Sequence, residues 1–106
     1  MHRLFPKKHV TIITSDVLEE KIIGFIRARR ASGYTIVRAR GAGSSGEQSG
    51  LLDIESNIKI HIILSPERLP GLLDDIDGLL KKGHHLILFV GDVSVLAPEK
   101  FESSPF

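Results

Sequence analysis

The amino-acid sequence predicts an α+β domain in which two helices cover one face of a four-stranded antiparallel sheet. Two observations carry this prediction. Segments rich in β-branched residues alternate along the chain, and two segments between them repeat apolar residues at helical spacing. The segments follow the order β-α-β-β-α-β, with a long glycine-rich stretch between the second and third strands.

The first part of the chain predicts a strand followed by a helix. Residues 1–8 form a basic arm that we expect to be mobile, and His9–Ser15 reads as a strand. Asp16 with Glu19 three residues later is typical of a capping box, so the helix is expected to start there. Gly33 is expected to end it in the left-handed conformation. The apolar residues at helical spacing are Leu18, Ile22, Phe25 and Ile26.

Two further strands are predicted on either side of the glycine-rich stretch. Residues 34–40 alternate, with Tyr34 and Ile36 on one face, and residues 54–64 alternate over a longer span. In the longer strand, one side carries lysine and histidine beside isoleucine, and we expect it to be a subunit interface or a site. The side expected to face the core carries Ile58, Ile60, Ile62 and Leu64.

The last part predicts a second helix and a final strand. Ser65 and Pro66 are suited to a helix start, although Pro70 allows a start near residue 69. Residues 81–83 close the helix. A strand over 85–90, a short fifth strand over 93–96 and a loose tail over 97–106 complete the prediction. The apolar stripe of the helix is Leu69, Leu72, Leu73, Ile76, Leu79 and Leu80.

Length and composition limit the function classes. The 106 residues fit a single domain, 1–106, and such a small domain gains from association with copies of itself. A formal net charge of +1 argues against binding nucleic acid through a broad basic face. The absence of cysteine excludes disulfides, thiol catalysis and cysteine-bound zinc. With no signal-peptide pattern and no membrane-length apolar run, we expect a cytoplasmic protein without membrane insertion.

The segment Gly41–Gly50 contains a G-x-G-x-x-G pattern over residues 41–46. A dinucleotide-binding fingerprint requires that such glycines open a helix, whereas here a strand follows. Backbone amides without a Cβ can nevertheless approach and cradle a phosphate. Both a phosphate-binding loop and an unstructured surface loop therefore remain open from this motif.

The other residues that could bind a ligand or take part in catalysis give weaker signals. Of the five histidines, His84 and His85 would point to opposite faces of a strand, and His9 and His61 lie on separate strands. We therefore predict no metal site.

One pair of acidic residues, Asp53 and Glu55, lies on the strand after the loop. No nucleophile and base pair accompanies them, so we predict no catalytic residues and expect them to anchor the base of the loop.

The predicted order is the ferredoxin-like arrangement, and its long loop between strands two and three resembles the PII signalling family. The resemblance is carried by Gly33–Val37, by Arg40–Ser44 with its G-x-G at the loop base, and by Asp53–Ile60 after the loop. It runs from His9 to Leu96. The sequence is most similar to the PII-like branch associated with bicarbonate transporters and carboxysomes.

This resemblance implies a non-enzymatic homotrimer that binds adenine nucleotides between subunits. A flexible T-loop, residues 42–52, would engage a partner such as a bicarbonate transporter or a carboxysome-linked protein, and bicarbonate is a candidate second ligand. Lys81–Gly83 falls at the family's phosphate-binding B-loop. The implied nucleotide-binding residues are Thr35, Arg40, Gly41, Gly43, Ser44, Ser45, Lys59, His61, Ile63, Lys82 and Gly83.

Several departures from the family pattern favour ADP or AMP over ATP. Asn57 stands where a phosphate-binding lysine is expected, the B-loop is short, and residues 93–98 contain no arginine or lysine. The loop also lacks the tyrosine that nitrogen-sensing members modify. Two alternatives remain: a trimeric structural or metal-tolerance module of the same fold, and a small nucleotide hydrolase using Asp53 or Glu55.

Overall fold

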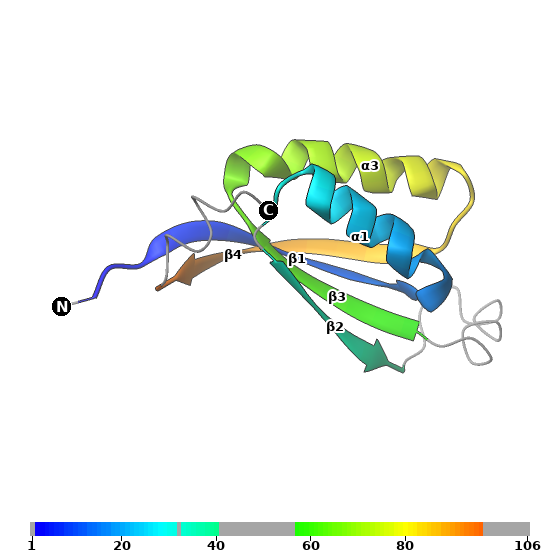
Figure 1. Cartoon of the computed structure of the whole chain (residues 1–106), viewed down its shortest axis with the longest axis horizontal. Coiled ribbons are helices and arrows are strands. Elements are labelled where there is room, and N and C mark those ends of the chain that lie inside the picture. Colours follow the sequence, from blue (N-terminus) through cyan, green and yellow to red (C-terminus); the bar gives the residue numbers. More distant parts are fainter. Residues whose placement is uncertain (1, 32, 41–56, 97–106) are drawn as a thin grey trace.

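The computed structural model describes residues 2–31, 33–40 and 57–96. The strands form one antiparallel sheet in the order β2-β3-β1-β4, and α1 and α3 lie side by side on one face of it (Figure 1). This is the predicted ferredoxin-like arrangement. The elements are β1 Phe5–Ser15, a 3-10 turn Asp16–Leu18, α1 Glu19–Ala28, β2 Gly33–Ala39, β3 Asn57–Leu64, a 3-10 turn Pro66–Arg68, α3 Leu69–Lys81 and β4 Leu86–Val95.

The sheet has one covered and one uncovered face, and the alternation of β3 shows which is which. Its even-numbered residues are buried under the helices, whereas its odd-numbered residues are half-buried. Strand residues alternate in direction, so the same division extends to β1 and β2 through their register with β3. The core between sheet and helices contains Val10, Ile12, Ile22, Ile26, Ile58, Ile60, Ile62, Leu72, Ile76 and Leu79.

The pairing of β1 with β4 corrects the predicted bounds of the first and the last strand of the chain. These strands pair from Phe5 opposite Val95 to Thr14 opposite Leu86. Residues 5–8 are therefore part of β1 rather than a mobile arm, because β4 supplies their hydrogen-bond partners. For the same reason β4 is one strand, not two, and Gly91 lies inside it opposite His9.

The start of α1 differs from the prediction, whereas the start of α3 agrees with it. Ser15 rather than Asp16 caps the 3-10 turn that precedes α1, since its Oγ accepts a hydrogen bond of 3.2 Å from the Val17 amide. Asp16 instead forms an ion pair of 3.1 Å with Arg38 of β2. The second helix begins at Leu69, as Pro70 allowed.

The end of α1 is set by Arg30 rather than by Gly33. Arg30 has a φ of 59°, the left-handed conformation, and the Ala31 amide donates to the Ile26 carbonyl at 3.2 Å. The Arg68 guanidinium donates to the Arg30 carbonyl at 2.7 Å, which ties this turn to the start of α3. Gly33 is already the first residue of β2, so its predicted role was wrong.

The two helices are joined by a paired contact between Arg29 and Asp75. The guanidinium donates from Nε to Oδ2 at 2.8 Å and from Nη2 to Oδ1 at 2.9 Å. This hydrogen bonding, with the charge of Asp75, raises the pKa of Arg29. Gly71 makes room for the contact, because a Cβ there would lie 2.7 Å from Arg29 Nη1.

The left-handed residue at the end of α1 gives a direct stability test. Glycine adopts this conformation without the Cβ clash that arginine suffers, so Arg30→Gly should raise the free energy of unfolding by about 0.5–1 kcal/mol. Urea denaturation monitored by circular dichroism measures the change. Gly83, with a φ of 94°, is the matched control, and Gly83→Ala should lower stability by about 1 kcal/mol. A loss of stability in Arg30→Gly would contradict this description of the helix end.

Candidate functional site

Four of the predicted nucleotide-binding residues share the uncovered face of the sheet. Thr35 of β2 lies directly opposite His61 of β3, and Lys59 and Ile63 flank His61 on the same face of β3. The alternation that buries the even-numbered isoleucines forces these odd-numbered side chains outward. The structure therefore brings Thr35, Lys59, His61 and Ile63 together as the face group.

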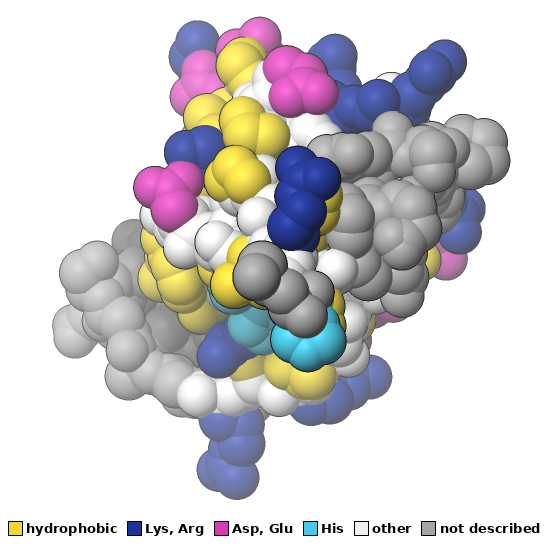
Figure 2. All heavy atoms as spheres, turned by 90° about the vertical axis from the view of Figure 1, so that its left-hand side faces the viewer, with side chains coloured by type: hydrophobic (Ala, Val, Ile, Leu, Met, Phe, Trp, Pro, Cys, Tyr) yellow, Lys and Arg dark blue, Asp and Glu magenta, His cyan; other side chains and the backbone are white. Residues whose placement is uncertain are grey.

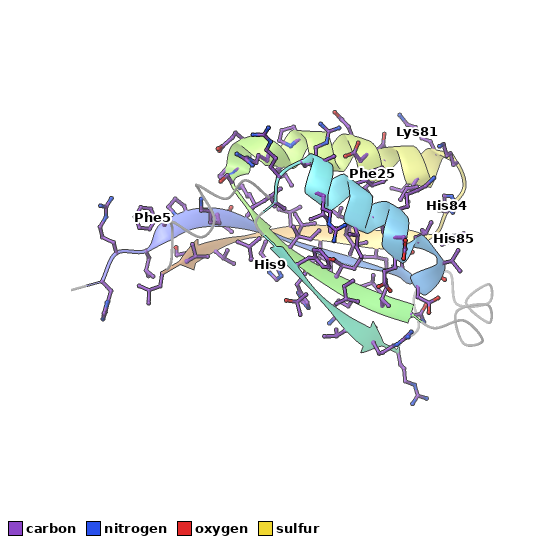
Figure 3. All side chains as sticks on the ribbon, in the orientation of Figure 1. Phe5, His9, Phe25, Lys81, His84 and His85 are labelled. Atoms are coloured by element: carbon purple, nitrogen blue, oxygen red, sulfur yellow. The ribbon has the colours of Figure 1, made fainter. Side chains whose placement is uncertain are left out.

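Three other predicted residues lie at one end of the sheet and form the end group. Arg40 follows β2, and Lys82 and Gly83 follow α3, beside the start of β4. Figure 3 shows Lys81, His84 and His85 at this same end. The end group is divided, however, because β2 and β4 are opposite edges of the sheet. Two strands lie between these edges, so they are separated by about 14 Å.

The turn after α3 offers fewer phosphate ligands than the family's B-loop implies. The amides of Lys82, Gly83 and His84 all donate to carbonyls of the last helical turn. Lys81 is engaged as well, since its Nζ lies 2.9 Å from Asp77. A phosphate bound here would therefore rely on the exposed side chain of Lys82.

The remaining predicted residues lie outside the described part of the chain. They are the loop glycines and serines, the T-loop over 42–52, the carboxylates that the hydrolase alternative needs, and the tail over 97–106. The residues concerned are Gly41, Gly43, Ser44, Ser45, Asp53 and Glu55.

A histidine pair at the centre of the uncovered face was missed by the sequence reading. His9 of β1 and His61 of β3 are diagonal neighbours, because His9 pairs with Ile63 and Thr11 pairs with His61. His9 Nε2 lies 3.0 Å from His61 Nδ1, and Thr11 Oγ1 lies 3.3 Å from the same nitrogen of His9. Only the register between strands far apart in the sequence brings these rings together.

The surroundings of the pair disfavour charge on His61. Burial lowers the pKa of His61 first, and the charges of His9 and Lys59 lower it further. Because a neutral imidazole both donates and accepts hydrogen bonds, the ring can interact with a neighbouring ring or a ligand as either partner.

Large apolar side chains surround the histidines on the uncovered face. Ile87 and Phe89 of β4 and Val37 of β2 lie on this face by their register and are 54%, 52% and 43% exposed. Figure 2, which views the end of the molecule where the chain begins, shows hydrophobic side chains at the surface beside histidine and lysine or arginine side chains. An apolar patch rimmed by polar groups is typical of an interaction surface.

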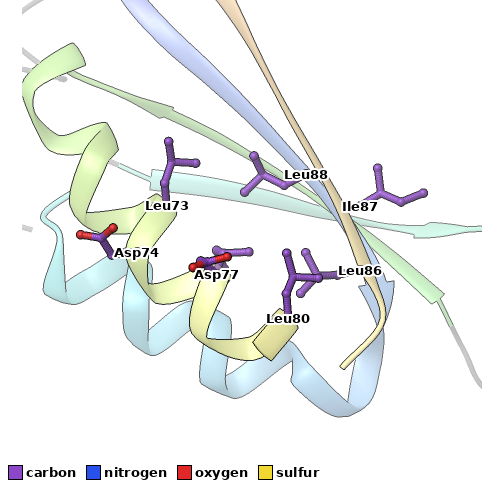
Figure 4. A pocket seen from close by; sticks show the side chains of 8 residues that line it. Leu73, Asp74, Asp77, Leu80, Leu86, Ile87 and Leu88 are labelled. Atoms are coloured by element: carbon purple, nitrogen blue, oxygen red, sulfur yellow. The ribbon is translucent and has the colours of Figure 1, made fainter. Parts of the chain in front are cut away.

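A separate groove runs between α3 and the edge strand β4, with a volume of about 650 Å³. Leu73, Leu80 and Leu88 give it an apolar lining, and Asp74 and Asp77 stand at its rim (Figure 4). Carboxylates repel phosphate groups, so this groove is unsuited to a nucleotide.

Neither a metal centre nor a membrane span is found among residues 2–31, 33–40 and 57–96. No three histidine, aspartate or glutamate side chains gather there as metal ligands would. The helices in these ranges also lack the length and apolarity needed to cross a bilayer.

The fold and these surfaces define a ferredoxin-like domain whose sheet has one face covered by helices and one uncovered, partly apolar face. Residues 7–100 match the protein family described as nitrogen regulatory protein P-II. Since this match covers most of the chain, the chain belongs to the PII family.

Solved structures of PII-like proteins are similar over nearly the whole chain. CPII from Thiomonas intermedia, bound to ADP, AMP and bicarbonate, has 27% identity and a TM-score of 0.82, covering 95% of this chain and 98% of its own. CPII bound to ADP and bicarbonate has 29% identity and a TM-score of 0.83, covering 96% and 100%. A PII-like signalling protein from Thermus thermophilus has 34% identity and a TM-score of 0.76, covering 92% and 97%.

The histidine pair predicts a pH dependence of stability. The pKa of His61 in the folded protein lies below its ordinary value of 6.5, so below that pH the unfolded chain takes up a proton more readily. The free energy of unfolding should therefore fall between pH 7.5 and pH 5.5, as urea denaturation at a fixed protein concentration can measure.

His61→Gln should remove part of this pH dependence, because glutamine does not titrate. The exposed His84 provides the control, and His84→Gln should leave the dependence as it is in the wild type. Equal pH dependence in the wild type and in His61→Gln would contradict this reading of the site.

Proposed function

We propose that this chain is a non-enzymatic, cytoplasmic sensor that binds ADP or AMP between the subunits of a homotrimer. The observation that carries the proposal is the similarity to CPII, which extends over about the full length of both chains and whose structures hold ADP, AMP and bicarbonate. Membership of the PII family supports a regulatory rather than a catalytic role.

The division of the candidate residues favours a site completed by a second copy. Thr35 and Arg40 are five residues apart along the extended chain, about 16 Å, and Lys59, which lies opposite Val37, is still about 10 Å from Arg40. The two parts of the end group are also separated by the width of the sheet. A neighbouring subunit that packs against the uncovered face would bring a face group from one copy towards an end group from another.

The available cations favour a short phosphate chain. In the described residues of the end group, Arg40 and Lys82 supply the side-chain charges, while the amides around Gly83 are used within the helix end. Two cations suit the charge of AMP or ADP better than that of ATP. We further propose that Gly41, Gly43, Ser44 and Ser45 complete the phosphate contacts.

The proposed physiological role is regulation of inorganic carbon uptake or fixation. Bicarbonate, which CPII binds, is the proposed second ligand. Nucleotide and bicarbonate would set the conformation of the T-loop, residues 42–52. That loop would engage or release a bicarbonate transporter or a carboxysome-linked protein, by the order-to-disorder switching that many regulators use.

Isothermal titration calorimetry tests the ligand assignment. ADP and AMP should bind more tightly than ATP, and bicarbonate should change the affinity for ADP. Arg40→Ala should weaken ADP binding about 10- to 100-fold, the effect of losing one charge-assisted hydrogen bond. Lys21→Ala, which removes an exposed cation from α1, is the charge-matched control and should bind like the wild type.

These titrations, together with an assay of phosphate release, separate the alternatives. No heat with any adenine nucleotide at millimolar concentration would contradict the proposal and leave a structural or metal-tolerance module. Steady phosphate release from ATP or ADP that Asp53→Asn abolishes would instead identify a hydrolase.

A further inference from the structure

The His9 and His61 rings meet edge to edge rather than face to face. Their planes are inclined by only 21° and their centres are 5.2 Å apart, while the facing nitrogens are 3.0 Å apart. The centre distance exceeds the nitrogen distance by about the width of one ring. The two nitrogens therefore point almost straight at each other along the line between the ring centres.

This geometry suits one proton held between two nitrogens. One ring donates N–H and the other accepts with its lone pair, and the pair can be neutral or carry a single positive charge. The same geometry disfavours a shared metal ion, because both lone pairs would have to turn from each other towards a common point. Protonation of both rings would place two N–H donors and two like charges against each other.

Among residues 2–31, 33–40 and 57–96, the groups around the pair do not compensate a second positive charge. Lys59 on β3 adds positive charge, and Thr11 on β1 and Thr35 on β2 are neutral. On β4 the nearest residues by register are Gly91 and Phe89. Farther along the strands, Lys7 of β1 donates to Ser65, and Lys8 pairs with Asp92 on the opposite face. The helices lie on the covered face.

We propose that the shared proton between His9 and His61 makes the uncovered sheet face a proton-controlled contact surface between copies of this chain. With one proton shared, the histidines lie compactly among Val37, Ile87 and Phe89, and the face can pack against a second copy. A second proton forces the rings apart and charges an otherwise apolar contact, which weakens association. The proposal rests on the homotrimer of the proposed function.

Subunit exchange between labelled copies tests the proposal. The chain has no cysteine, so Lys21→Cys on exposed α1 provides one labelling site for donor and acceptor dyes. Subunits of mixed nucleotide-free populations, followed by energy transfer, should exchange about tenfold faster at pH 5.5 than at pH 7.5, because a second positive charge on the pair weakens the contact between copies. His61→Gln and His9→Gln should each reduce this ratio to near one, and His84→Gln should keep it.

Results of the exchange experiment and of NMR spectroscopy can each contradict the proposal. Equal exchange rates at pH 5.5 and pH 7.5 in the wild type would overturn the proposal. So would a wild-type ratio of the two rates in both His9→Gln and His61→Gln. The absence of energy transfer in the wild type at pH 7.5 would overturn it as well. Circular dichroism confirms that each variant is folded. Nitrogen-15 NMR of the wild-type imidazoles should show one shared proton at the facing nitrogens, and two independently titrating rings would also overturn it.

Failure of the proposed function would look different. ADP binding is measured separately at pH 7.5, the pH at which the proposal expects associated copies. Absent ADP binding with pH-dependent exchange would contradict the sensor alone, and ADP binding with pH-independent exchange would contradict only the proton control.

Discussion

The packing of α1 and α3 against the isoleucines of β3 is the constraint on which the rest of this structure depends. Ile58, Ile60 and Ile62 are at most 2% exposed beneath the helices. Side chains alternate along a strand, so burying these residues fixes Lys59, His61 and Ile63 on the other face. A one-residue slip of register would exchange the two sets and place lysine and histidine in the core.

The two-layer architecture also explains why this small domain should act as an assembly. Helices cover only one face of the sheet, and the other face exposes Ile87, Phe89 and Val37 around a histidine pair. Within one chain the candidate nucleotide ligands are divided between that face and two edges of the sheet. The proposed binding site between subunits and the proposed apolar contact between subunits are therefore two consequences of the same uncovered surface.

Periodicity in the sequence was enough to predict the order of elements and the covered face, because each is encoded locally. It also predicted most of the helix stripes, but Leu80 of α3 is 46% exposed and lies outside the core. The errors lie where distant segments decide the outcome. Residues 5–8 become strand because β4 pairs with them, and Arg30 rather than Gly33 ends α1, with Arg68 of the distant second 3-10 turn bound to its carbonyl. The His9 and His61 contact depends on strand register, which single-sequence patterns do not contain. Family resemblance supplied the candidate nucleotide-binding residues, of which Thr35 and His61 are neighbours by register.

The central claim is that the uncovered faces of three copies meet and that nucleotide binds between them. Native mass spectrometry of the protein with ADP tests this claim most directly, because it counts chains and ligands in one measurement. The claim predicts a species of three chains that takes up as many as three ADP molecules, with no ADP retained by single chains. Single chains that bind ADP, or a trimer that takes up none, would contradict it.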